Sequence, residues 1–447
     1  MKNLISRLSS TISETSRIDD QLFEQYNVKR GLRNKDHTGV VVGLTKIGDV
    51  VGYERNDKGE IVPIPGKLIY RGFSVEDIVR GAQKTHRLGF EEVIFLLLSG
   101  DLPKAKELDG FTTLLSRTMS IDQKMTLHLL DLKGDDIMNI LARCVLELYI
   151  FDENPDETSP RNMMKQSLEL ISRFPTIIAY GYNALRHNKG KSLHIRHPKE
   201  GLPLAENFLY MMKGKNYTPL EVQILDLALM VHADHGGGNN STFAVRVTSS
   251  TNTDIYAAIS AGIGSLKGSL HGGANLRVVD MLNNIKKNVK DWTNVSQLDA
   301  YLQLILNKKA YNKTGLIYGI GHAIYTISDP RTVLLKEMAR DLAIEKGREK
   351  EYNFMCLIEE RAILLFMESK GKAIGKQVCA NVDFYSGFIY DMIGLPKEIF
   401  TPLFAMARIA GWCAHRIEEL NFKQKRIMRP AYKSACSERS YVEMENR

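Results

Sequence analysis

Residues 231–282 read VHADHGGGNNSTFAVRVTSSTNTDIYAAISAGIGSLKGSLHGGANLRVVDML and set histidines and glycines in an apolar, helix-forming background. Two breaks interrupt this pattern, HGGGNN at residues 235–240 and SLHGGAN at residues 269–275. Because glycine allows positive φ and a close approach of backbone to a ligand, each break puts a histidine where a small molecule can reach it. The pattern predicts helices separated by ligand-contacting loops.

His271 precedes an amphipathic helical pattern that begins near residue 276. The positive end of a helix dipole disfavours an imidazolium, so the ring is expected to be neutral. A neutral imidazole can donate a hydrogen bond to a developing enolate. The alternative is a helix stop with a buried, satisfied histidine.

Composition bounds the class of protein. The 447 residues suggest two or three domains at ~150 residues each. A hydrophobic content of 44% and a charged content of 25% are ordinary for a globular protein, and no apolar run approaches the roughly 20 residues of a membrane span. The net charge of +8 is spread over short runs, such as Lys286-Lys287, so we expect no nucleic-acid or membrane partner.

Cysteines and early acidic residues indicate the compartment. The five cysteines are odd in number and form no CxxC pair, which favours a reducing environment over a disulfide framework or a zinc site. Glu14, Asp19 and Asp20 argue against an import signal. A cytoplasmic location is predicted.

The remaining chain reads almost entirely as helix at a 3.6-residue spacing. The exception is Thr38–Phe73, where β-branched clusters such as Val40–Val42 flank an Asn-Asp-Lys-Gly turn at residues 56–59, with Pro63, Pro65 and Gly66 closing the region. The predicted fold is all-α with a small N-terminal β-hairpin region. Helices are expected near residues 13–26, 74–82, 90–98, 103–120, 135–150, 159–185, 204–213, 218–235, 253–266, 276–287, 295–306, 330–345, 351–370, 384–393 and 397–420.

Two further segments combine reactive side chains with local breaks. His322 lies in a glycine-flanked loop nine residues before Arg331. Arg331 opens a helix after Pro330, and its guanidinium suits bidentate binding of a carboxylate. The alternative is a capped loop with a surface arginine. Asp383 stands between apolar and aromatic residues, which would raise its pKa and suit a general base. It is equally placed to cap the following helix.

Two arginines complete the set. Arg408 has small apolar neighbours on both sides, so it is predicted to be buried against an anion, either a ligand or an internal salt-bridge partner. Arg429 precedes a proline and so belongs to an extended arm that either reaches another subunit's site or is disordered. Together with His235, His271 and His322, these groups suit a di- or tricarboxylate ligand and acid–base chemistry beside a carbonyl.

These motifs resemble the citrate synthase family. The resemblance rests on HADH at 232–235, LHGGAN at 270–275, Gly321-His322 through DPR at 329–331, and NVDFYSG at 381–387, in the family's order and intervals. Segments YRGF at 70–73 and FLLLSGDLP at 95–103 extend it over about residues 65–430. It implies a large domain of residues 1–274 and 396–447, a small domain of residues 275–395, and a homodimer with the active site in the cleft between domains.

The resemblance also implies the reaction, in which oxaloacetate, acetyl-CoA and water give citrate and CoA without a metal or other cofactor. By this likeness Asp383 removes a methyl proton, His271 hydrogen-bonds the thioester carbonyl, and His322 protonates the ketone. The other implied site residues are His235, Asn239, Ser241, Arg331, Arg408 and, across the dimer, Arg429 for substrate, with Arg30 and Lys376 near CoA.

One departure and three rival functions accompany this resemblance. Many family members carry a basic residue for a CoA phosphate between His322 and Arg331, where this chain has Tyr325, Thr326 and Ile327. A 2-methylcitrate synthase, which uses propionyl-CoA, would share every motif, because one methylene changes selectivity by only about 1–3 kcal/mol. A nucleic-acid-binding module and a metallohydrolase are more distant alternatives, the latter using His232, Asp234, His235, His322 and Asp383.

Overall fold

The computed structural model describes residues 2–36, 38–371 and 377–447. By its internal contacts the chain forms two units, one of Leu44–Ile427 and one of Met1–Gly43 with Met428–Arg447. The predicted division into a large domain and a small domain of residues 275–395 is a finer one, and it stays a prediction.

The only sheet in the described residues is a small antiparallel one in the order β1-β2-β3. Its strands are β1 (Gly48–Arg55), β2 (Ile61–Tyr70) and β3 (Phe73–Ser74). Gly59 turns the chain between β1 and β2 with φ 77° and donates its N–H to the Asn56 carbonyl at 2.8 Å. The predicted hairpin is therefore confirmed.

Two details of the predicted hairpin are wrong. Val40–Val42 lie outside the strands, and the segment Pro63–Gly66 lies within β2 instead of closing the hairpin. The pairing register shifts between Val51 and Tyr53, so part of this segment has no partner on β1. Such a bulge accommodates proline, which lacks the N–H that a regular ladder requires.

The hairpin packs against a loop that lies far away in the sequence. Gly66 donates its N–H to the Ser328 carbonyl at 3.1 Å, and the Tyr325 hydroxyl donates to the Lys67 carbonyl at 3.2 Å. A Cβ at Gly52 would lie 2.5 Å from the Ile324 carbonyl oxygen, so only glycine permits this approach. The sheet thus supports the loop that joins His322 to Arg331.

Helices form nearly all the rest of the unit Leu44–Ile427. Their starts carry the expected caps, as at Thr218, which forms a capping box with Glu221 ahead of Pro219. The helices are α4 (Val75–Lys84), α5 (Phe90–Ser99), α6 (Ala105–Thr118), α7 (Gln123–Asp131), α8 (Ile137–Glu147), α9 (Pro160–Asn188), α10 (Leu204–Lys213), α11 (Pro219–His232), α12 (Asn240–Ser249), α13 (Ile255–Lys267), α14 (Ala274–Asn288), α15 (Val295–Leu306), α16 (Pro330–Glu345), α17 (Glu349–Phe366), α19 (Asp383–Met392) and α20 (Phe400–Leu420).

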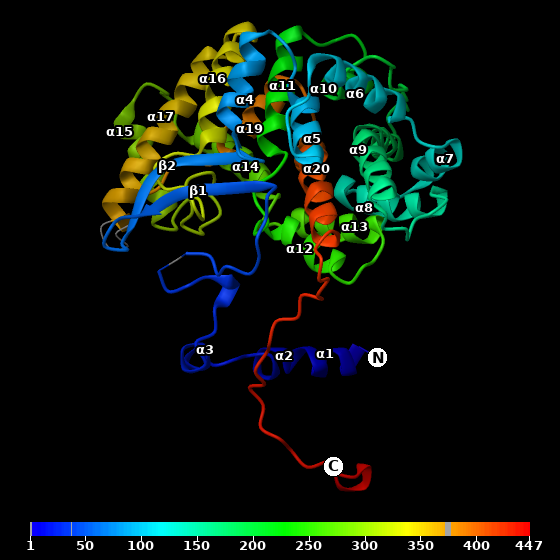
Figure 1. The fold of residues 1–447 in the computed structure, drawn as a ribbon. Coiled ribbons are helices and arrows are strands. Elements are labelled where there is room, and N and C mark those ends of the chain that lie inside the picture. The colour runs from blue at the N-terminus through cyan, green and yellow to red at the C-terminus, as the bar shows by residue number, and fades with distance from the viewer. Residues whose placement is uncertain (1, 37, 372–376) are drawn as a thin grey trace. The chain divides into compact units, whose positions relative to one another are not determined.

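Helix α20 lies at the centre of the packing. It contacts α5, α9, α11, α12 and α13, and Figure 1 shows it in orange-red between α11 and α13. Its Trp412 and Arg408 are both 0% exposed. A buried tryptophan is expected in such a core, whereas a buried guanidinium requires a particular explanation.

The predicted all-α class is confirmed, with errors at particular helices. Helix α7 and helix α12 are not among the predicted helices, and the predicted helix 397–420 is a 3₁₀ turn at Lys397–Ile399 followed by α20. The sequence of α12, NSTFAVRVTS, has low helix propensity, and its packing against α13 and α20 overrides that preference. Ser74 is the N-cap of α4 as predicted, but its side chain makes no capping bond.

In its described residues, the N-terminal part of the other unit contains three short α-helices. These are α1 (Lys2–Ser10), α2 (Ile12–Thr15) and α3 (Asp20–Gln25), where the sequence predicts one helix over residues 13–26. Across the described part of the chain, no helix combines the length and apolar character needed to cross a lipid bilayer.

Candidate active site

The first histidine loop follows the end of α11. Asp234 donates its backbone N–H to the Tyr70 hydroxyl at 3.2 Å, and its carboxylate accepts the N–H of Gly236 at 2.8 Å. Gly236 adopts φ 76°, a conformation that favours glycine. This turn presents His235, whose side chain is buried and whose Nε2 has no hydrogen-bond partner among the described residues.

His271 lies in the second glycine-rich break, between α13 and α14. Its Nε2 accepts from the Ser241 N–H at 3.4 Å and lies 3.1 Å from the Ser241 hydroxyl. The proton of a neutral ring is therefore on Nδ1. Burial, followed by the charge of Arg408, lowers the pKa of His271 to about 4. The predicted neutral imidazole is consistent with this shift, but its cause is burial and a cation instead of the helix dipole.

Ser241 and Asn239 support that histidine. The buried Ser241 hydroxyl lies 3.0 Å from the Asn239 side-chain oxygen and accepts the indole N–H of Trp412 at 3.3 Å. Since the hydroxyl is fixed by these contacts, it fixes the orientation of the His271 ring in turn. This geometry suits the orienting role that the resemblance implied.

The His322 loop is held against the segment that leads to Asp383. Gly321 donates its N–H to the Cys379 carbonyl at 2.7 Å, and Asn381 returns a backbone bond to Gly319 at 2.8 Å and a side-chain bond to the Gly321 carbonyl at 2.8 Å. These bonds bring two segments separated by about sixty residues into one structure. His322 and Asp383 therefore belong to a single local framework.

His322 has a defined tautomer in this framework. Its Nδ1 accepts the backbone N–H groups of Ile324 at 3.1 Å and Tyr325 at 3.0 Å, so a neutral ring carries its proton on Nε2. The ring stacks on Tyr325 with centroids 4.6 Å apart and meets His235 edge-on at 5.3 Å. Burial, followed by Arg331 and His322, holds the pKa of His235 well below its usual value. The two loops thus place two imidazoles side by side.

Asp383 is the first residue of α19, and it does not cap that helix. The capping contact comes from the Asn381 side-chain oxygen, which accepts the Asp383 N–H at 3.0 Å. Burial raises the pKa of the Asp383 carboxyl to about 6, with Arg331 and Arg408 opposing the rise. Its Oδ1 is buried without a hydrogen-bond partner in the described chain. A desolvated carboxylate of this kind is a suitable general base.

Packing of α14 against α19 relates Asp383 to His271. The Asn275 amide donates to the Ser386 hydroxyl at 2.7 Å, and a Cβ at Gly387 would collide with Val279. Both His271 and Asp383 are within electrostatic reach of Arg408. The Phe404 ring lies 6.5 Å from the His271 ring and 4.7 Å from the guanidinium carbon of Arg408, so His271 and Arg408 line the same region.

Two of the three predicted substrate arginines, Arg331 and Arg408, differ in their partners. Arg331 is buried and donates Nε and Nη2 to the two oxygens of Asp329, at 3.0 and 2.8 Å. Arg408 donates Nε to the His232 carbonyl at 2.7 Å and lies 4.7 Å from the Phe404 ring centroid. Both its Nη1 and its Nη2 are buried with no partner within the described residues. An internal salt bridge, which is the alternative to a ligand, therefore does not explain the burial of Arg408.

The unpaired guanidinium is the strongest indication of a ligand. Burial lowers the pKa of Arg408 to about 10, and Asp234 acts in the opposite direction. A buried cation with two unused donors is costly unless an anion meets it. A carboxylate offers two oxygens in the geometry that those donors require.

Three predicted site residues do not belong to the described part of the unit Leu44–Ile427. Arg30 and Arg429 are exposed residues of the unit Met1–Gly43 with Met428–Arg447, and Arg30 pairs with Asp20 at 3.2 Å. Lys376 lies outside the described residues. Their roles stay predictions. At the departure from the family pattern, Tyr325 is fully buried and Ile327 is 42% exposed.

Two of the five side chains named for a metallohydrolase are used for other contacts. His232 is bonded to the Ala228 carbonyl at 2.7 Å, and Asp234 is bonded to His415 at 3.1 Å. Where the structure describes the chain, no group of three or more His, Cys, Asp or Glu side chains has the geometry of a metal site. The set that remains fits acid–base chemistry on an anionic carbonyl compound.

Three residues in or beside the site are not identified by the sequence analysis. Asp329 neutralises Arg331, Phe404 lies under Arg408, and His415 holds Asp234. Asp329 has a visible signal, because it stands before Pro330 at a helix start, where an N-cap carboxylate accepts the N–H of Arg331. For Phe404 and His415 the only signal in the sequence is their spacing from Arg408 along one helix. Phe404 lies one turn before Arg408, and His415 lies two turns after it.

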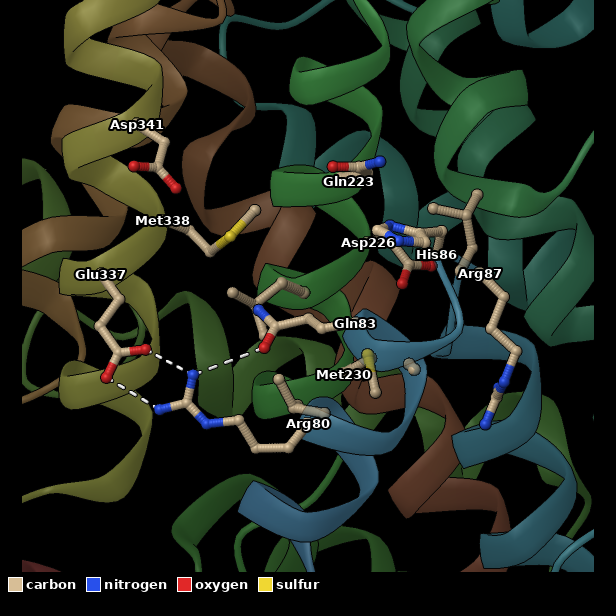
Figure 2. A pocket seen from close by; sticks show the side chains of 14 residues that line it. Arg80, Gln83, His86, Arg87, Gln223, Asp226, Met230, Glu337, Met338 and Asp341 are labelled. Carbon is tan, nitrogen blue, oxygen red and sulfur yellow. Dashed lines mark hydrogen bonds and ion pairs between the residues drawn. The ribbon is translucent and has the colours of Figure 1, made fainter.

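A cavity of about 350 Å³ lies away from these groups, between α4, α11 and α16. Figure 2 shows Arg80 bridging to Glu337 across it, with bonds of 2.6 and 2.8 Å. Asp226, also at its wall, accepts the backbone N–H groups of Gly89 and Phe90. Arg80, Glu337 and Asp226 are therefore partnered within the protein, whereas Nη1 of Arg87 at the same wall is buried without a hydrogen-bond partner in the described residues.

Comparison with known proteins agrees with this site. Residues 36–431 match the family model described as "Citrate synthase, C-terminal domain". The chain therefore belongs to the citrate synthase family, as its motifs predicted, and is an enzyme of the transferase class.

Individual relatives cover most of the chain. It is 37% identical to a citrate synthase of Deinococcus radiodurans over 360 residues, which are 80% of this chain and 88% of the relative. It is 30% identical to a 2-methylcitrate synthase of Shewanella oneidensis over 81% of this chain and 87% of the relative. A ternary complex of carboxymethyl coenzyme A and oxaloacetate with citrate synthase from Thermoplasma acidophilum aligns with a TM-score of 0.76 and 28% identity, covering 94% of this chain and 99% of that one.

Proposed function

We propose that this protein condenses oxaloacetate with acetyl-CoA and hydrolyses the resulting thioester to citrate and CoA. The observation that carries the proposal is the buried Arg408, whose two unused donors lie in a site with His235, His322 and Asp383. Oxaloacetate is a dicarboxylate with a ketone, and it can satisfy these groups together. The structure of the Thermoplasma acidophilum relative is a complex with the same ligand.

Substrate binding follows from the donors. One carboxylate of oxaloacetate accepts from Nη1 and Nη2 of Arg408, and the other meets His235 and the remaining Nη1 of Arg331, because Asp329 occupies Nε and Nη2. The ketone oxygen lies toward Nε2 of His322, which carries the proton of the neutral ring. That hydrogen bond polarises the ketone for attack.

Enolisation follows from Asp383 and His271. The Asp383 carboxylate takes a proton from the acetyl methyl group while Nδ1–H of His271 donates to the thioester oxygen. Because His271 is neutral, it stabilises the enolate by donating a hydrogen bond and does not transfer a full proton. The enolate carbon then bonds to the ketone carbon, and the new alkoxide takes a proton from His322. Water finally cleaves the thioester and releases CoA.

Several accompanying features are also proposals. We propose, from the sequence, that the protein is a cytoplasmic homodimer, that Arg429 enters the site of the partner subunit, and that Arg30 and Lys376 contact CoA. The reaction as written requires no metal or other cofactor, with acetyl-CoA as co-substrate.

The test is a thiol-release assay with oxaloacetate and either acetyl-CoA or propionyl-CoA. The proposal predicts CoA release with a higher kcat/KM for acetyl-CoA. A higher kcat/KM for propionyl-CoA would assign the protein to the 2-methylcitrate synthases, one of which is among its relatives. No thiol release with either thioester would contradict the proposal altogether.

A further inference from the structure

A chain of buried hydrogen bonds leads from the surface of α12 and α20 to the turn that carries His235. The Asp234 carboxylate accepts from Nε2 of His415 at 3.1 Å, and Nδ1 of His415 lies 2.8 Å from Nη1 of Arg246. The same Nη1 lies 2.8 Å from the Glu418 carboxylate. Asp234 and His415 are both 0% exposed.

The inner end of the chain fixes backbone geometry next to the site. One Asp234 oxygen accepts from His415, and the other accepts the Gly236 N–H. His235 is the residue between Asp234 and Gly236, so this second bond closes a tight turn around it. Gly48 and Gly411 border this carboxylate so closely that a Cβ at either would collide with it. The carboxylate therefore has one position, and through the Gly236 N–H it fixes the backbone on the far side of His235.

The direction of each hydrogen bond is determined by Arg246. A guanidinium only donates, so Nδ1 of His415 must accept and its Nε2 must carry the proton. That proton is what Asp234 accepts. A histidine in the other tautomer would present a lone pair to a carboxylate and break the chain.

The outer end is anchored by two acids. Arg246 pairs with Glu418 at 2.8 Å and with Glu419 at 3.0 Å, and the other Glu418 oxygen accepts the Lys46 N–H at 2.7 Å. Lys46 lies two residues before β1, where the sheet that supports the His322 loop begins. The chain thus ties α12, α20 and the hairpin to the same turn.

We propose that His415 and Arg246 are positioning residues of the active site, which act through Asp234 to orient His235 toward a substrate carboxylate. This inference rests on the proposed function, because it assumes that His235 binds oxaloacetate. Neither residue touches the substrate. Their effect is therefore expected on oxaloacetate binding and much less on acetyl-CoA.

The experiment compares three variants of the full-length protein. His415→Leu removes both bonds, whereas His415→Gln keeps one donor and one acceptor at a similar spacing. Arg416→Leu is the matched control, because Arg416 is the next residue of α20, is buried, and bonds to Ser249 and Thr253, neither of which belongs to the chain of hydrogen bonds that ends at Asp234. For each variant we would measure both KM values, kcat, Tm, and the oxaloacetate Kd by calorimetry.

We expect His415→Leu to raise the KM and the Kd for oxaloacetate on the order of tenfold, because it leaves a buried carboxylate short of a charge-assisted bond. The KM for acetyl-CoA should change far less, and His415→Gln should recover most of the loss. Arg416→Leu should lower Tm and leave both KM values near those of the wild type. A His415→Leu protein with unchanged oxaloacetate KM and Kd would overturn the proposal.

Two further readouts keep the test decisive. If His415→Leu does not fold, Glu418→Gln at the outer end should raise the oxaloacetate Kd in the same direction by a smaller factor, and an unchanged Kd there would overturn the proposal. Calorimetry measures binding without turnover. A wild-type protein that binds oxaloacetate but releases no CoA would contradict the proposed function and still leave the positioning role open to measurement.

Discussion

The active-site groups and the cavity between α4, α11 and α16 are both rich in charge, and they differ in how that charge is partnered. In the cavity Arg80 pairs with Glu337 (Figure 2), and Asp226 accepts two backbone N–H groups. Arg87 at its wall pairs through Nη2 with Glu92, although its Nη1 is buried without a partner in the described residues. In the active site both terminal nitrogens of Arg408 and one oxygen of Asp383 are buried and lack partners within the described residues. Arg87 has the Glu92 carboxylate for its charge, whereas no carboxylate of the described residues is bonded to Arg408, so an anionic ligand is favoured at Arg408.

The largest effect on activity is expected for a substitution of Asp383. Asp383→Ala should lower kcat by at least about a hundredfold, because loss of a positioned general base typically costs 10²–10⁴ in rate. Oxaloacetate affinity should remain close to that of the wild type. Steady-state kinetics and calorimetry would measure the two effects.

The matched control for Asp383 is Asp391→Asn. Asp391 belongs to the same helix, but its side chain is 51% exposed and pairs with Arg348. We expect this variant to keep nearly full kcat. An Asp383→Ala enzyme that turns over at the wild-type rate would refute the general-base assignment.

The second prediction concerns Arg408. Arg408→Leu should raise the KM for oxaloacetate by about tenfold to a hundredfold, since hydrogen bonds to charged groups are worth about 1.5–3 kcal/mol. The Tm of the ligand-free protein should stay the same or rise, because the change removes a buried cation with two unused donors.

Arg416→Leu should show the opposite behaviour. Arg416 is equally buried in α20, but it donates to the Thr253 carbonyl at 2.7 Å and to the Ser249 hydroxyl at 3.3 Å. Its loss should lower Tm and leave the oxaloacetate KM unchanged. If Arg408→Leu instead lost stability and kept its KM, Arg408 would be a structural residue.

A third prediction concerns pH. Burial raises the pKa of Asp383 to about 6, and catalysis needs its ionised form, so activity should increase as pH rises through that value. Below it, kcat/KM for acetyl-CoA should fall about tenfold per pH unit. Burial lowers the pKa of His271 to about 4, so this ring stays neutral while Asp383 titrates and adds no second inflection to the pH–rate profile in that range. A rate profile that is flat between pH 5 and 7 would argue against Asp383 as the base.

The smallest effect is expected in the cavity. Arg80 and Glu337 are 44% and 47% exposed, and an ion pair of that exposure contributes at most about 1 kcal/mol. Arg80→Ala should therefore change unfolding free energy only slightly and leave both KM values alone. A strong loss of oxaloacetate binding in this variant would mean that the cavity, and not the Arg408 site, receives the substrate.

Local sequence signals predict much of the fold and of the site. Helix caps and periodicity locate most helices, and the neighbouring glycines identify His235, His271 and His322 as candidate site residues. Helix α12 is not predicted, because its residues have low helix propensity and its stability comes from packing. Tertiary packing of this kind leaves no periodic mark in a single sequence.

The partners of the site residues are harder to predict. His415 and Asp234 are separated by 181 residues, and no spacing rule connects them. The pairing of Arg331 with Asp329 is local, but the sequence does not show that Nη1 and Nη2 of Arg408 stay without a partner in the described residues. Candidate site residues and their loops can be predicted from one sequence. Whether a buried polar group has a hydrogen-bond partner depends on the folded chain.

The most direct test of the account is a crystal structure of this protein with oxaloacetate. We predict that one substrate carboxylate lies within hydrogen-bond distance of both Nη1 and Nη2 of Arg408, with His235 and His322 on the same ligand. Oxaloacetate bound in the cavity beside Arg80 and Glu337, with the Arg408 nitrogens still unpartnered, would contradict it.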